Sequence, residues 1–126
     1  MVILCAPSAS SFSLLICGIG SIQGNYYFVE FCAFEDLQLN SYELKVLSQP
    51  RQIEIQLPEV TLKQNDTIYV TNKRNLSAYF ETPVSEYELR SMDLRNGDNP
   101  IQLMRLVNDT SVVSTSRFQL YNHVFQ

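Results

Sequence analysis

His123 is the only histidine of the chain, and histidine is the side chain whose ordinary pKa lies nearest to neutral pH. A single histidine excludes a metal site built from several imidazoles, and it weakens the case for any catalytic triad that contains histidine. Tyr121 and Phe125 share its side of a predicted strand. We therefore interpret His123 as a structural residue, and we expect no catalytic residues in this chain.

Acidic residues lie beside predicted turns without a catalytic pattern. Glu35 and Asp36 follow a predicted strand, and three more carboxylates lie in or near turns: Asp93, Asp98 and Asp109. Paired carboxylates can perform acid–base chemistry, but Asp in a turn is the ordinary case. The segment "DLRNGDNP" lacks both the ligand order and the distal glutamate of a calcium loop. We expect no metal site.

The glycines of "LLICGIGSIQG" follow an apolar run, as they would in a dinucleotide-binding loop. That loop needs G-x-G-x-x-G at the start of a helix, so that backbone amides meet the pyrophosphate. Here Gly24 comes one residue late, and the strand-like "NYYFVEF" follows. A turn or a β-bulge explains these glycines better, and we expect no cofactor.

Three cysteines lie in apolar contexts at wide spacing: Cys5, Cys17 and Cys32. An odd number cannot pair completely, and no C-x-x-C spacing is present for zinc. We predict three reduced, buried thiols that pack as small apolar side chains. The alternative is one disulfide with one free thiol, which would favour an extracellular setting.

Three acceptor sequences for N-glycosylation occur in predicted loops, at Asn65, Asn75 and Asn108. Glycans would fit at such positions. Because we expect no signal peptide and no disulfide, we interpret the three acceptor sequences as chance products of turns that are rich in Asn and Thr.

The composition indicates a globular chain that does not bind nucleic acid. Its 126 residues are 45% hydrophobic and 17% charged, enough for a core and typical of one domain, residues 1–126. The net charge is −4, and the nine Lys and Arg residues are scattered except for Lys73 and Arg74. Binding to phosphates needs a basic cluster.

Alternation of apolar and polar residues is the main structural signal. The clearest run is "QIEIQL", which should bury Ile53, Ile55 and Leu57 and expose Glu54 and Gln56. In "YELKVL" the apolar residues should point inward, with Glu43 and Lys45 outward. The run "NYYFVEFCAF" is apolar on both faces, which predicts a strand that lies between two layers. Four more runs are strand-like: "TIYVT", "SAYFE", "IQLMRLV" and "RFQLYNHVF". We predict an all-β fold, an antiparallel β-sandwich that resembles a jelly roll in its number of strands.

One segment has helix-like ends. Ser85 suits an N-cap, Glu88 follows three residues later, and Gly97 lies beyond the last turn. Tyr87 and Leu89 alternate as in a strand, which argues the other way. We predict one short helix near residues 86–95.

The first charged residue is Glu30, so the stretch from Met1 to Val29 could be a membrane span, a secretion signal or core strands. A signal peptide needs a positive start, which is lacking, and Pro7 with its neighbouring serines interrupts any long helix. We predict two buried strands around a serine-rich turn, with Leu14 and Ile16 on one face and Leu15 and Cys17 on the other. Membrane contact by residues 1–24 is possible but not favoured.

These observations favour a non-catalytic structural protein, a protomer or minor component of a larger assembly such as a virion shell, with protein partners in a homo- or hetero-oligomer. We expect it inside cells or in a virion, with no cleaved signal peptide. The first alternative is an extracellular adhesin-like or receptor-like binding module that uses aromatic loops such as Tyr79-Phe80. The second is a small enzyme, which would need a pocket holding His123 beside a carboxylate.

Overall fold

The computed structural model describes residues 13–22, 26–48, 50–72, 76–80, 83–92, 94, 100–108, 110–113, 118–119 and 124–125. Within these ranges the chain forms strands and two short 3₁₀ turns, η2 (Leu39–Ser41) and η3 (Leu76–Tyr79), with no α-helix. The all-β prediction is confirmed.

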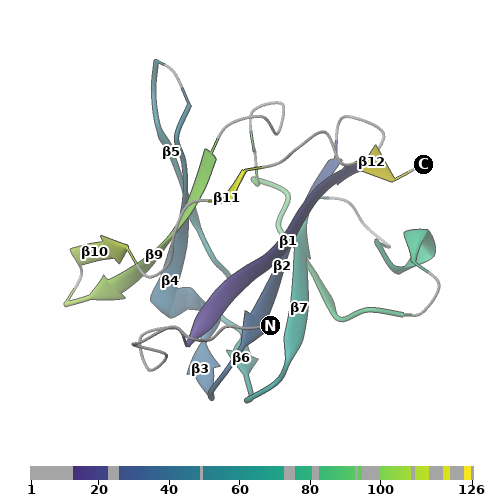
Figure 1. Ribbon diagram of the computed structural model, residues 1–126, viewed down its shortest axis with the longest axis horizontal. Coiled ribbons are helices and arrows are strands. Elements are labelled where there is room, and N and C mark those ends of the chain that lie inside the picture. The colour runs from purple at the N-terminus through teal and green to yellow at the C-terminus, as the bar shows by residue number, and fades with distance from the viewer. Residues whose placement is uncertain are drawn as a thin grey trace.

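Three sheets contain the strands (Figure 1). The first, sheet A, has the order β12-β1-β2-β7-β8; the second, sheet C, has the order β10-β9-β4-β5, with β11 also paired to β9; β3 and β6 form a small third sheet. The strands are β1 (Leu14–Ile22), β2 (Tyr26–Ala33), β3 (Leu37–Gln38), β4 (Tyr42–Val46), β5 (Ile53–Gln56), β6 (Thr61–Leu62), β7 (Thr67–Thr71), β8 (Glu86–Glu88), β9 (Pro100–Val107), β10 (Thr110–Val113), β11 (Phe118–Gln119) and β12 (Val124–Phe125).

One apolar core lies between sheets A and C. Sheet A contributes the inward side chains of β1, β2 and β7, among them Phe31 and Val70, and sheet C contributes those of β4, β5 and β9, among them Leu44 and Leu103. Figure 1 shows β1, β2 and β7 as one layer and β4, β5 and β9 as another. β2, β4, β5, β7 and β9 reach this core with every second residue, because successive side chains of a strand point to opposite faces.

The predicted faces of several strands are confirmed. In β5, Ile55 is buried and Ile53 packs against the core, while Glu54 and Gln56 are exposed; Leu57, just after the strand, is also buried. In β1, Leu14 and Ile16 are buried, whereas Leu15 is half-buried and Cys17 is exposed. Pro7 and the first predicted strand lie outside the described residues.

Glu43 departs from its predicted exposure. It lies on the face of β4 opposite Leu44, yet only 3% of it is accessible to solvent. Its cross-strand neighbours are Gln56 on β5 and Met104 on β9, and Gln56 Nε2 donates a hydrogen bond to Glu43 Oε2 at 2.9 Å. The hydrogen bond makes burial of this carboxylate tolerable.

The predicted helix near residues 86–95 is wrong. Residues 86–88 form β8, which pairs in parallel with β7, and the Tyr69 and Leu89 N–H groups donate to the carbonyls of Ser85 and Thr71. The segment thus satisfies the edge of β7, which a helix would leave unpaired. Met92 and Leu94, beyond β8, are buried in the core.

Two further strand predictions need correction. The run "SAYFE" begins within η3, and its Glu81 lies outside the described residues; "RFQLYNHVF" contains two separate short strands, β11 and β12. The sheets are also not purely antiparallel, because β12 and β8 join the edges of sheet A in parallel.

Candidate binding surface on the outer face of sheet A

The face of sheet A that points away from the core carries a second apolar cluster. Phe28 on β2 and Leu76 on η3 are buried there, with Tyr69, Tyr79 and Phe80 packed against them. The ring centroids of Phe28, Tyr69 and Phe80 lie 5.2–5.8 Å apart in tilted or edge-on arrangements. These distances are in the favourable range for aromatic pairs. This aromatic cluster is why β2 is apolar on both faces: η3 covers the outer one.

Glu86 at the start of β8 fixes η3 on this face. Its carboxylate accepts hydrogen bonds from the Leu76 N–H at 2.9 Å, the Ser77 N–H at 3.0 Å and the Ser77 hydroxyl at 3.0 Å. The Ser77 hydroxyl oxygen also accepts from the Val84 N–H at 3.1 Å. Hydrogen bonds to an ionised group are about twice as strong as neutral ones, so one carboxylate holds the loop by three bonds.

Glu30 forms a polar pair with Tyr69, a member of the aromatic cluster. They are cross-strand partners on β2 and β7. Burial raises the pKa of the Tyr69 phenol, and the Glu30 charge and hydrogen bond raise it further. The raised pKa keeps Tyr69 protonated to a higher pH than an ordinary tyrosine, which suits the hydrogen bond with Glu30.

Gly18 lies opposite Glu30 on β1. A Cβ at this position would lie 3.0 Å from Glu30 Oε1, closer than ordinary packing allows. The missing side chain leaves room for the Glu30 carboxylate, which is the close approach that glycine permits within a strand.

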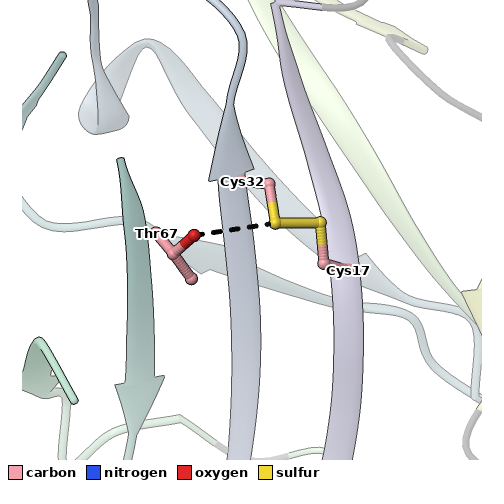
Figure 2. Close-up of a disulfide and its surroundings, with 3 residues drawn as sticks. All are labelled: Cys17, Cys32 and Thr67. Atoms are coloured by element: carbon pink, nitrogen blue, oxygen red, sulfur yellow. Dashed lines mark hydrogen bonds between the residues drawn. A yellow bond between two sulfur atoms is a disulfide. The ribbon is translucent and has the colours of Figure 1, made fainter. Parts of the chain in front are cut away.

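A disulfide joins Cys17 to Cys32 on the same outer face (Figure 2). The prediction of three reduced thiols is therefore wrong, and Cys5 lies outside the described residues. A β-bulge lies at Cys17: the register passes from Ile16–Phe31 to Gly18–Glu30, so Cys17 is the extra residue. Leu15 pairs with Cys32, and Cys17 follows Leu15 by two residues, so the Cys17 side chain lies on the same outer face as Cys32. Only the spacing of the cysteines was visible in the sequence, and three cysteines do not reveal their pairing.

Figure 2 shows Thr67, Cys32 and Cys17 side by side on three neighbouring strands. The Thr67 hydroxyl lies 4.0 Å from Cys32 Sγ, a weak hydrogen bond to sulfur. Cys17 is exposed and Cys32 is half-buried. The disulfide thus lies at the solvent-facing side of the sheet, outside the main core.

The other candidate residues do not come together. Asp36 is exposed, accepts a hydrogen bond from the Gln64 N–H and lies 3.7 Å from the Lys63 ammonium group, which is a structural role in a turn. Gly18 and Gly20 lie within β1 and not in a nucleotide loop. Five candidates lie outside the described residues: Gly24, Asp93, Asp98, Asp109 and His123. Among the residues that are described, no three His, Cys, Asp or Glu side chains form a possible metal site.

Two of the three possible glycan acceptors can be placed. Asn65 and Asn108 are exposed and lie in turns, and both have a positive backbone φ, 72° and 51°. Asn75 lies outside the described residues. Asn adopts this left-handed conformation more readily than most residues, as the turn chemistry of the sequence indicates.

No family model matches this chain, and no curated protein matches it in sequence. In the part of the chain that is described, no helix is long and apolar enough to cross a membrane.

Proposed function

We propose that this protein is a non-catalytic binding module of an oxidising, extracellular compartment, which contacts a protein partner through the outer face of sheet A. The observation that carries the proposal is the Cys17–Cys32 disulfide. Disulfides persist in secreted and cell-surface proteins and are rare where the cell keeps thiols reduced. The exposure of Cys17 also supports an oxidising compartment, because cellular reductants could reach an exposed disulfide.

The aromatic cluster supports the choice of surface. Tyr79 and Phe80 are half-buried and pack against the cluster of Phe28 and Leu76, and the Phe80 ring also contacts Tyr69. Glu86 fixes the loop that carries them. Aromatic residues on a loop that a rigid scaffold positions are typical of protein recognition sites.

A blocking substitution tests this surface without removing its anchors. Ala78 is the exposed residue of η3, between the anchored Ser77 and Tyr79. Ala78→Arg should abolish binding of the purified, labelled protein to intact cells, whereas Gln52→Arg should not. Gln52 is exposed and directly precedes β5 of sheet C. Because alanine and glutamine are both uncharged, each variant adds one positive charge. Equal binding by both variants would exclude this surface.

A second candidate is the protomer of a larger assembly, as the composition favours. Its support is a set of exposed apolar side chains: Phe34 is 49% exposed, Tyr87 41% and Val107 41%. Subunits of an assembly bury such side chains against neighbours. Light scattering across a range of protein concentrations distinguishes the candidates, since a monomer at every concentration would leave no support for the assembly.

A further inference from the structure

Asn65 lies at the tip of the turn between β6 and β7, and the turn is held through its backbone. The Asn65 N–H donates to the Ala33 carbonyl at 2.9 Å, and the Ala33 N–H donates to the Asp66 carbonyl at 2.9 Å. The Asp66 N–H donates to the Lys63 carbonyl, and the Asp66 carboxylate accepts from the Lys63 N–H, each at 2.9 Å. A substituent on the Asn65 side-chain amide would break none of these bonds.

The three residues of the acceptor sequence are all exposed: Asn65, Asp66 and Thr67. The positive φ of Asn65 places it at a sharp corner of the chain. Thr67 is the first residue of β7. Its hydroxyl, which defines the acceptor sequence, lies 4.0 Å from Cys32 Sγ, a weak hydrogen bond. Attached sugars can therefore extend into solvent from the folded protein.

We propose that Asn65 carries an N-linked oligosaccharide; this inference rests on the proposed extracellular setting. In the transfer, the Asn65 Nδ2 atom forms a bond to the anomeric carbon of a sugar donor linked to lipid pyrophosphate. The bond between that carbon and the pyrophosphate oxygen breaks, the lipid pyrophosphate leaves with the electron pair, and Nδ2 loses one proton. No oxidant is needed, and a secretory cell supplies both the donor and the transferase.

The test is expression of the full chain behind a secretion signal in a eukaryotic cell, followed by mass spectrometry of the peptide that contains Asn65. We expect an oligosaccharide on this peptide. Removal with an amidase in ¹⁸O-labelled water should then convert Asn65 into labelled Asp. An unmodified Asn65 in secreted protein would overturn the proposal.

Three variants separate glycosylation from folding. Asn65→Asp removes the acceptor nitrogen but tolerates the positive φ, so the protein should fold and lose this oligosaccharide. Thr67→Val keeps a β-branched residue at the start of β7 and should also lose it, while Thr67→Ser should retain it. Loss of the oligosaccharide from Thr67→Ser as well as Thr67→Val, or its retention by Thr67→Val, would contradict the proposal.

The outcome separates this proposal from the proposed function. Secreted protein with the Cys17–Cys32 disulfide and a bare Asn65 would overturn only the glycan. Protein in which Cys17 and Cys32 stay reduced would overturn the extracellular setting, even if Asn65 were modified in the expressing cell.

Discussion

The Cα atoms of Cys17 and Cys32 lie 6.1 Å apart on neighbouring strands, although the residue registered opposite Cys32 is Leu15. Cys17 is the extra residue of a bulge, between the pairs Ile16–Phe31 and Gly18–Glu30. Because the disulfide closes a loop with a sequence separation of 15 residues, it restricts the unfolded chain.

Removing this disulfide should destabilise the protein. We expect the Cys17→Ala/Cys32→Ala variant to lose about 2–4 kcal/mol of the free energy of unfolding, the typical contribution of a native disulfide. Urea unfolding with and without reductant measures the loss. Reductant should lower the stability of the parent protein by a similar amount and leave the variant unchanged. Thiol counting on the denatured, unreduced protein should find one thiol; three would contradict the disulfide.

Truncation in the core should cost more than truncation on the surface of the same strand. Ile55 is buried in β5, so Ile55→Ala should destabilise by about 2–5 kcal/mol. Its neighbour Glu54 is exposed and lies 3.9 Å from Lys45 in an ion pair, so Glu54→Ala should change stability by less than about 1 kcal/mol. Denaturant unfolding compares the two variants, and similar losses would show that the strand register is wrong.

Loss of the Glu86 carboxylate should release η3. Glu86→Ala leaves the Leu76 and Ser77 N–H groups without their acceptor, and we expect their hydrogen exchange to accelerate. The free energy of unfolding should fall by about 1–3 kcal/mol. Glu88→Ala is the matched control, because Glu88 also lies on β8. The Glu88 carboxylate lies 3.1 Å from the guanidinium group of the exposed Arg90. Unchanged exchange at Leu76 and Ser77 in Glu86→Ala would contradict the role of Glu86.

Neutralising Glu30 should lower the pKa of Tyr69. Burial raises this pKa above its usual 10.0, and the charge and hydrogen bond of Glu30 raise it further, so Glu30→Gln removes the charge and leaves burial, the largest cause. Tyrosine-labelled NMR titration, with Tyr69→Phe to assign the signal, measures the shift. A raised phenol pKa stabilises the fold below pH 10, and this contribution is lost as the pH rises through the folded-state pKa. Above pH 10, Glu30→Gln should therefore lose this contribution at a lower pH than the parent protein does. A Tyr69 pKa that does not fall in Glu30→Gln would contradict the pairing.

Local alternation determined which residues form the core. The period of two in β4 and β5 places Leu44 and Ile55 inward whatever the strands pair with, because successive side chains of a strand point to opposite faces. The turn at Asn65 was likewise readable, since Asn tolerates the conformation that it adopts there. These properties depend on residues next to one another in the chain.

Only the tertiary structure decided the disulfide, β8 and the burial of Glu43. Cys17 bonds to Cys32 on the neighbouring strand, Glu86 accepts hydrogen bonds from Leu76 and Ser77, and Glu43 is buried beside Gln56 on the next strand. Each outcome depends on a partner that folding brings close from at least nine residues away. Segment 86–95 has both helical and strand-like features, and the unpaired edge of β7 favours the strand because β8 satisfies its backbone groups.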